Sequence, residues 1–336
     1  MAWHHRMNFG PLRPPSRSPR GCEAGREPSA GSLPKVNATG HPADRPRRSQ
    51  DPVERRYRST QAPHALACRA MQTVTAEALS SALGRDSGPY TARASAKGAL
   101  LNETHSVFRA LADGVSVPEI RDACLVGNLL RQTARETRRQ IWTAIHWRYF
   151  AWAPPAWVLE DYARAANSDA SSPEFVPLAY LHYARRDRLV FDFVVEKLWP
   201  LHLAGSRGVS RDDVMTFLDE RFESQESRWR ESVRIKVAGS VLSSLRNFGL
   251  FAGRQRKKSQ RPVIAPAAAL HHCRLLYAEG LRGRSILEAP DWRLFRWSPE
   301  DVAGALARLA QTGHVRFERV GRTVVLELPD FAADDL

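Results

Sequence analysis

Residues 131–150 read RQTARETRRQIWTAIHWRYF, a stretch without Pro or Gly that predicts a helix. On a helical wheel, at about 100° per residue, one sector of roughly 100° holds four arginines: Arg131, Arg135, Arg138 and Arg139. A separate sector of similar width holds small and apolar residues: Ala134, Ile141, Ala144 and Ile145. The predicted helix therefore has one face to bury and one face whose arginines repel one another until a polyanion supplies the opposite charge.

Two other residues of this stretch bear on its interpretation. Glu136 is its only acid and cannot neutralise four guanidinium groups. Trp142 continues the arginine sector, where it is predicted to pack against a sugar or to support a guanidinium group. Arg131 to Arg139 span about 12 Å at about 1.5 Å per residue, close to the width of a major groove. The stretch predicts a DNA-binding surface; the alternative is a solvated basic face on a core helix.

The residues before this stretch predict two more helices. Residues 99–112, ALLNETHSVFRALA, place apolar side chains at helical spacing, and Gly114 follows as a stop signal. Ser116 and Glu119 form a capping box for a second helix, which is expected to run to about residues 127–128. Helix, turn, capped helix, turn and basic helix is the order of a helix-turn-helix module.

The downstream sequence predicts a second helical domain. Residues 151–205 read as helical scaffold, densely apolar from 175 to 199, and Pro200 with the stretch 205–208 marks a boundary. We therefore expect an N-terminal domain at 71–205 and a C-terminal domain at 209–336. The second domain opens with a capped helix at Ser210, and a longer helix ending near Gly249 follows it.

A second basic segment, GRQRKKSQRPVIAP at 253–266, follows that longer helix. It carries five cations within eight residues: Arg254, Arg256, Lys257, Lys258 and Arg261. Helix, basic turn and short strand resemble the recognition helix and wing of a winged-helix domain, and such a turn is suited to phosphate contacts. A plain solvated loop is the alternative.

After a helix starting at Ser298, residues 314–328 alternate as a hairpin with Gly321 at its turn. The expected fold is mainly α, with helix-turn-helix and winged-helix-like modules and short β-hairpins in the C-terminal domain.

Charge and proline are concentrated in residues 1–70. The chain of 336 residues has a net charge of +14, which favours nucleic acid or an acidic surface as partner. Residues 1–70 hold 13 Arg and Lys against 5 Asp and Glu, and 10 of the 22 prolines. We expect a disordered basic leader. It is interpreted as a tail for non-specific nucleic-acid binding, as a transit peptide, or as the product of a misassigned start whose true position is near Met71.

Motifs typical of enzymes, metal sites and membrane spans are missing from the sequence. The four cysteines are scattered, and Cys124, among apolar neighbours, is predicted to be a buried thiol. His271, His272 and Cys273 are adjacent, but no second ligand pair follows at metal spacing. Asp212, Asp213 and Asp291 lie near expected helix starts, where capping explains them. No segment approaches 18 uncharged apolar residues. We expect a cytoplasmic, non-enzymatic protein without metal or cofactor.

Three stretches resemble the BrxA family of BREX (bacteriophage exclusion) phage-defence systems. They are YTARASAKGALLNETHSVFRALADG (90–114), EIRDACLVGNLLRQTARETRRQI (119–141) and PLAYLHYARRDRLVFDFVVEKLW (177–199). The resemblance covers roughly residues 90–336, is clearest from Tyr90 to Trp199, and omits residues 1–70. It implies a mostly helical bacterial protein that binds double-stranded DNA, has no enzymatic activity and accompanies other BREX components.

Two alternatives to DNA binding remain open. The family is similar in part to the antitermination factor NusB, so the basic faces are also compatible with RNA as the ligand. A scaffold subunit that docks an acidic partner protein on the same basic face is the second alternative.

Overall fold

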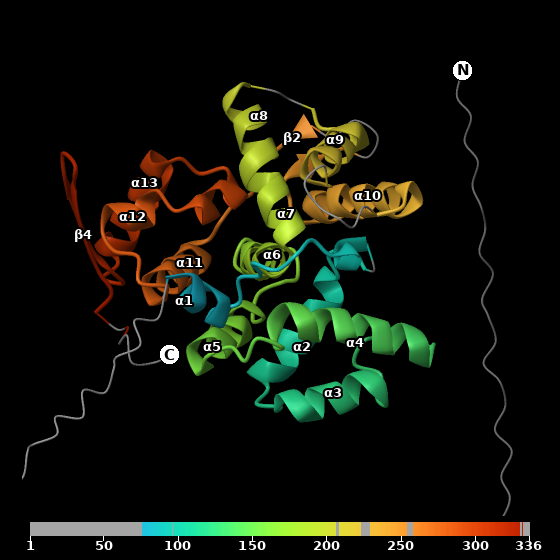
Figure 1. Ribbon diagram of the computed structural model, residues 1–336. Coiled ribbons are helices and arrows are strands. Elements are labelled where there is room, and N and C mark those ends of the chain that lie inside the picture. The colour runs from blue at the N-terminus through green and yellow to red at the C-terminus, as the bar shows by residue number, and fades with distance from the viewer. Residues whose placement is uncertain are drawn as a thin grey trace, which may run out of the picture. The chain divides into compact units, whose positions relative to one another are not determined.

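The computed structural model describes residues 76–95, 97–205, 208–222, 229–253, 258–329 and 331, which are mainly helical (Figure 1). Contacts divide the chain into Met1–Ala67 and Cys68–Leu336, and every described residue belongs to the second unit. The predicted leader, the alternative start at Met71 and three residues of the basic turn (Arg254, Arg256 and Lys257) lie outside the described residues.

The first half of the described chain is helical throughout. Its elements are α1 (Ala76–Ala82), the 3-10 helix η1 (Ala92–Ser95), α2 (Leu101–Ala112), α3 (Val117–Leu125), α4 (Arg135–Tyr149), α5 (Ala156–Ala165), α6 (Phe175–Arg186), α7 (Arg188–Asp192), the π-helical segment η2 (Phe193–Leu198) and α8 (Trp199–Leu203).

The second half adds two small antiparallel sheets. Its elements are α9 (Arg211–Phe222), α10 (Glu231–Asn247), β1 (Phe251–Ala252), β2 (Lys258–Ser259), α11 (Pro266–Ala278), α12 (Arg284–Leu287), the 3-10 helix η3 (Pro290–Phe295), α13 (Pro299–Gln311), β3 (Arg316–Val320) and β4 (Thr323–Glu327). Phe251 pairs with Ser259 in the first sheet, and Val320 pairs with Thr323 beside the turn of the second. The prediction of a mainly α fold with short hairpins towards the C-terminus is confirmed.

Local capping signals position several of these helices as predicted. The Ser116 amide donates to Glu119 Oε2 at 3.0 Å before α3, and the Ser298 amide donates to Asp301 Oδ2 at 2.8 Å before α13. The Ser210 amide likewise donates to Asp213 Oδ2 at 2.7 Å before α9. Each contact satisfies a backbone donor that the first turn of a helix leaves unpaired, so these helix starts follow from sequence alone.

Helix α6 lies at the centre of the unit, where Figure 1 shows it end-on. Ten of its twelve residues are buried, as expected of a helix that is apolar almost all round. It contacts α2, α4 and α5 from the first half and α11 and η3 from the second. One hydrophobic core therefore extends from Leu83 to Phe331. The predicted boundary between residues 205 and 209 does not divide this core, because elements on both sides share α6.

A buried ion cluster connects α6 to the C-terminal half. Arg185 on α6 donates to Asp291 at 2.7 Å through Nη1 and also pairs with Glu279, and Arg85 pairs with the other oxygen of Asp291. The side chains of Arg185 and Asp291 are 0% exposed. The prediction that Asp291 serves as a helix cap is therefore wrong. Its carboxylate instead compensates the charges of buried guanidinium groups. The spacing of residues in the sequence does not reveal this pairing.

Candidate nucleic-acid interface

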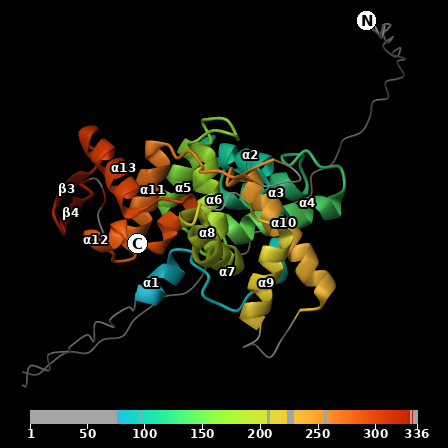
Figure 2. The same cartoon turned by 90° about the horizontal axis from the view of Figure 1, so that it is seen from above.

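Helices α3 and α4 pack against each other at one end of the unit, and the hairpin β3–β4 lies at the opposite end in both views (Figures 1 and 2). Residues 126–134 connect the two helices, a longer connection than the three- or four-residue turn of a helix-turn-helix motif. Helix α4 begins at Arg135, so the prediction that it starts at residue 131 is wrong. Arg131 instead lies in the connection with a left-handed backbone, at φ 51°.

The connection is held close to α3 at Gly127. A Cβ placed on this residue would lie 2.7 Å from the backbone oxygen of Ala123, closer than van der Waals contact permits. Arg138 Nη1 on α4 donates to the Gly127 carbonyl at 2.9 Å. Glycine is thus required at position 127 because the backbone of the connection lies against that of α3. Arg138 holds the connection against α4.

Replacing Gly127 by Ala is expected to lower the free energy of unfolding by about 1–3 kcal/mol, because backbone must shift to admit the methyl group. Urea unfolding followed by circular dichroism measures it. Gly239→Ala is the matched control, since a Cβ there meets nothing within 4 Å and Ala favours the interior of α10 by about 1 kcal/mol. Equal stability of the Gly127 variant and the wild type would contradict the close-approach argument.

A basic groove of about 560 Å³ lies between α3 and α4. We call it the arginine groove; it is lined by Arg121, Asp122, Leu125, Val126, Arg135, Arg138 and Arg139. It brings together three of the arginines predicted on α4 and adds Arg121 from α3. Arg131 does not line it. The groove presents four guanidinium groups against the carboxylate of Asp122, so it has a strong excess of positive charge.

The arginines of the groove differ in how far they are already paired. Arg139 binds Glu136 through Nε at 2.8 Å and Nη2 at 2.7 Å, and these bonds, with one from Gln140, lower the pKa of Glu136 to about 2. Arg121 contacts the adjacent Asp122 at 3.3 Å. Within the described part of the chain, the guanidinium of Arg135 has no hydrogen-bond or ion-pair partner. Arg135 is therefore the most available of these cations for an external anion.

Trp142 does not extend the exposed arginine face. Its side chain is 6% exposed and stacks on Phe150, with ring centroids 6.1 Å apart. The predicted contact between Trp142 and a sugar is incompatible with this position. The wheel places Trp142 within the arginine sector, but packing against Phe150 draws the large ring inward.

The N-terminus of α4 adds to the positive potential of the groove. Ala134 precedes the helix and offers no side-chain hydrogen bond to the amides of the first turn. Those unpaired amides and the helix dipole favour an anion, yet the first turn carries Arg135 and Arg138 beside a single acid, Glu136. An uncapped N-terminus surrounded by arginines is suited to bind phosphate.

Arg121, which lines the groove, and His146, which lies near Arg121, were not identified from the sequence. Arg121 lies on the exposed face of α3, and His146 lies one helical turn beyond Trp142 on α4. Burial lowers the pKa of His146, and the neighbouring charge of Arg121 lowers it further. The helical spacing of Ile120 and Cys124, both buried, was the available signal, because it places Arg121 on the side of α3 that faces away from the core.

The second predicted basic surface is described only in part. Lys258 is exposed and lies in β2, which pairs with β1, whereas it was predicted in the turn; residues 263–264, where the short strand was predicted, form no strand. Arg261 instead binds Asp301 at 2.8 Å, and its guanidinium lies 5.9 Å from the ring centroid of Trp297. Lys258 is thus open to solvent, whereas Arg261 is already engaged with α13.

His271 belongs to a hydrogen-bonded chain in the core. Its Nδ1 lies 2.8 Å from Asp161 Oδ2, and its Nε2 lies 2.8 Å from His182 Nε2. His272 packs instead against Trp292, with ring centroids 3.9 Å apart. No group of three or more His, Cys, Asp or Glu side chains in the described chain is arranged to hold a metal ion. The hydrogen bonds of His271 to Asp161 and His182 thus link α5, α6 and α11 within the core.

The described cysteines are buried, as predicted for Cys124. Cys124 and Cys273 are both 0% exposed, and burial raises the pKa of each thiol to about 12. Neither thiol is therefore a reactive group at neutral pH.

These features define a class: a mainly helical protein with a single core and a groove of guanidinium groups at one end. The chain belongs to the BrxA family, whose sequence model matches residues 88–271. Family membership indicates a component of a BREX phage-defence system. No helix among the described residues has the length and apolar character needed to cross a membrane.

Similarity to solved structures and to curated proteins gives no further information about function. The chain is similar to the crystal structure of an uncharacterized protein from Magnetospirillum magneticum, at 15% identity and a TM-score of 0.49 over 62% of this chain and 100% of that chain. At this TM-score the similarity carries no argument about function. No curated protein matches the chain significantly.

Proposed function

We propose that the protein is a non-enzymatic, cytoplasmic DNA-binding component of a BREX system, and that the arginine groove holds the phosphate backbone of duplex DNA. The observation that carries this proposal is the position of Arg121, Arg135 and Arg139 around the uncapped N-terminus of α4. Guanidinium groups and helix N-termini are both preferred phosphate partners. Arg131, exposed in the connection that precedes α4, adds a further positive charge.

The test is a titration of the full chain with fluorescent duplex DNA, single-stranded DNA and a structured RNA at several salt concentrations. Duplex binding that weakens linearly with log salt is expected, since each neutralised phosphate releases counterions. Tighter binding of the RNA would favour the RNA-binding alternative. Binding of none of the three would contradict the proposal.

An acidic partner protein is the second candidate for the same groove. Leu125 and Val126 contribute apolar surface to its lining, and Val126 is 83% exposed. A groove with both guanidinium groups and exposed aliphatic side chains suits a protein segment that carries acidic and apolar residues. Pull-down of BREX components with wild type and with a Val126→Ser variant separates the two, because DNA binding through phosphate does not depend on Val126.

Lys258 provides a test of the hairpin as a second DNA contact. Lys258→Glu is expected to weaken duplex binding and to lower the salt slope by about 1, because one phosphate contact is lost. Stability should not change, since the side chain is exposed. Arg261→Gln is the control: Arg261 is occupied by Asp301, so its replacement should leave the slope unchanged. An unaltered slope in Lys258→Glu would remove the hairpin from the interface.

A further inference from the structure

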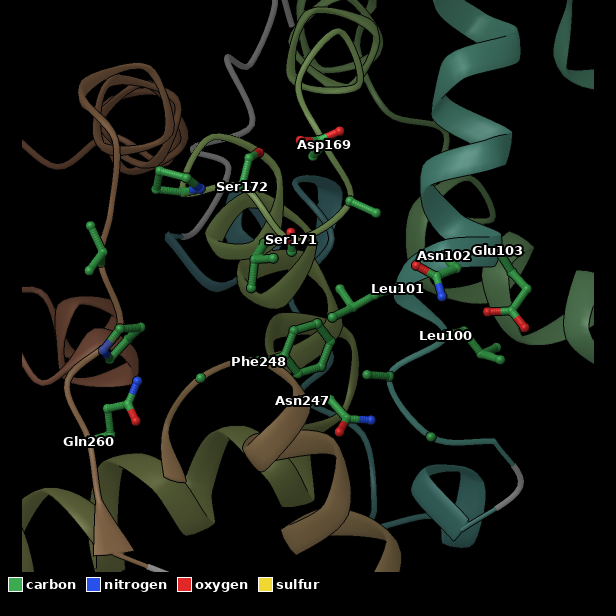
Figure 3. A pocket seen from close by; sticks show the side chains of 18 residues that line it. Leu100, Leu101, Asn102, Glu103, Asp169, Ser171, Ser172, Asn247, Phe248 and Gln260 are labelled. Carbon is green, nitrogen blue, oxygen red and sulfur yellow. The ribbon is translucent and has the colours of Figure 1, made fainter. Parts of the chain in front are cut away.

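A second, larger groove lies away from the arginine groove. It has a volume of about 1020 Å³ and is bounded by the start of α2, the loop before α6, the end of α10 and the extended segment after β2. Figure 3 shows Gln260 on one side, Asn102 and Glu103 on the other, and Asn247 and Phe248 between them. We call it the amide groove. Elements from both halves of the chain build it, and the DNA-binding proposal does not use it.

The lining of the amide groove is neutral to acidic, although the protein carries a net charge of +14. Three amides, Asn102, Asn247 and Gln260, line it with the hydroxyls of Ser171 and Ser172, and no Lys or Arg is among the described residues of its wall. The carboxylates of Glu103 and Asp169 also line it and have no ion-pair partner within the described chain. Such a surface repels phosphate, but it offers hydrogen-bond donors and acceptors to uncharged groups.

Cations lie at both ends of this surface. At one end the amide groove runs into a smaller groove of about 390 Å³, which shares Asn102, Glu103 and Ala170 with it and is also lined by Arg131. Within the described residues, the guanidinium of Arg131 has no hydrogen-bond or ion-pair partner. A free cation therefore marks this end.

The other end is marked by Lys258. The Ser259 hydroxyl accepts a hydrogen bond from the buried Arg296, and successive side chains of an extended segment point to opposite sides. Lys258 and Gln260 therefore share the side opposite Arg296, and Gln260 lines the amide groove. This alternation places Lys258 on the same side as Gln260, just beyond the residues that line the amide groove.

We propose that the amide groove holds the bases of an unpaired stretch of nucleic acid, with Arg131 and Lys258 binding phosphates at its two ends. This inference rests on the proposed nucleic-acid binding and adds the ligand class: an opened or single-stranded segment next to duplex. Asn and Gln side chains pair with the edges of bases, and carboxylates accept hydrogen bonds from exocyclic amino groups. A basic peptide would suit the carboxylates, but Arg131 and Lys258 would repel it at both ends.

The experiment compares a paired DNA duplex with the same duplex carrying a central unpaired bubble that contains 2-aminopurine. Wild type is expected to bind the bubble at least about tenfold more tightly and to change the 2-aminopurine emission on binding. The variant Asn102→Ala/Asn247→Ala/Gln260→Ala should lose this preference. Its affinity for paired duplex and its salt slope should be unchanged, because no charge is removed.

The outcomes separate this inference from the proposed function. Tight duplex binding without preference for the bubble, or a preference that survives in the triple amide variant, overturns the amide-groove assignment and leaves duplex binding intact. Failure to bind any nucleic acid overturns both. A fluorescent oligolysine peptide whose binding is lost in Glu103→Gln/Asp169→Asn would assign the groove to a basic protein segment instead, and would also overturn the inference.

Discussion

Replacing Arg121, Arg135 and Arg139 together by Ala is expected to lower the slope of log K against log salt for duplex DNA by about 2.7. Each phosphate that an arginine neutralises contributes about 0.9 to this slope. The pairs of Arg121 with Asp122 and of Arg139 with Glu136 are well exposed, so phosphate can replace these carboxylates. The loss of affinity between 50 and 200 mM salt should then be about 40-fold smaller than in wild type. Arg138 is left in place, because its hydrogen bond to the Gly127 carbonyl supports the fold. Fluorescence anisotropy across a salt series measures the slope.

The matched control removes the same charge at the other end of the unit. Arg284, Arg316 and Arg319 lie on α12 and β3, far from α3 and α4 in both views (Figures 1 and 2). Their triple Ala variant should keep the wild-type slope if binding is local to the arginine groove. Equal slopes for the groove variant and wild type would refute the proposed interface. Equal losses in both variants would indicate attraction by net charge alone.

Arg185→Met is expected to lower the free energy of unfolding by about 3–5 kcal/mol, the largest stability effect among the changes considered. Removing one partner of a buried ion pair leaves the other charge without compensation. Here Glu279 loses its cation and Asp291 keeps only Arg85; the two carboxylates are 2% and 0% exposed, so water cannot replace the guanidinium. Chemical unfolding monitored by tryptophan fluorescence measures the change.

Two variants control this result. Arg284→Met breaks an exposed i,i+4 pair with Glu288 and should cost less than about 1 kcal/mol. Arg185→Met/Glu279→Gln also removes the carboxylate that is left without a cation, while Asp291 keeps Arg85, and it should recover part of the loss. A single Arg185→Met variant as stable as Arg284→Met would show that the cluster contributes no more than a surface pair.

The same cluster predicts acid sensitivity. Burial alone would raise the pKa of Asp291, but the charges of Arg185 and Arg85 outweigh it and lower the pKa to about 2. An unfolded Asp has a pKa of about 3.9. The carboxylate therefore contributes stability that is complete above about pH 4 and is lost as the pH falls towards 2. Unfolding free energies measured across this range should fall more steeply in wild type than in Arg185→Met.

Much of the local structure could be predicted because it depends on neighbours in sequence. The capping boxes at Ser116, Ser210 and Ser298 satisfy their own first turns, so three helix starts follow from spacing of three residues. Gly321, at φ 58°, meets the backbone requirement of the two-residue turn between β3 and β4. The BrxA resemblance was likewise readable from residues 90–199, and the family match confirms it.

The candidate site was predictable only in part. The helical period placed Arg135, Arg138 and Arg139 on one side of α4, where they line one groove. The period could not show that Arg138 binds the Gly127 carbonyl, that Arg139 binds Glu136, or that Arg121 of α3 joins them. Whether an arginine is free or paired depends on its rotamer and on which atoms of other elements lie near it. A helical wheel shows neither.

The sequence by itself determined the helical class, the capped helix starts, the hairpin turn and the excess of positive charge, because each depends on composition or on residues within one or two turns. Only the tertiary structure decided that both halves share the core around α6, that Asp291 compensates Arg185, and that an amide-lined groove adjoins the smaller groove of Arg131. Those features join residues about a hundred positions apart. The physical reason is burial: a charge or an apolar face removed from water is stabilised by whichever partner the fold brings near, and chain distance does not limit that choice.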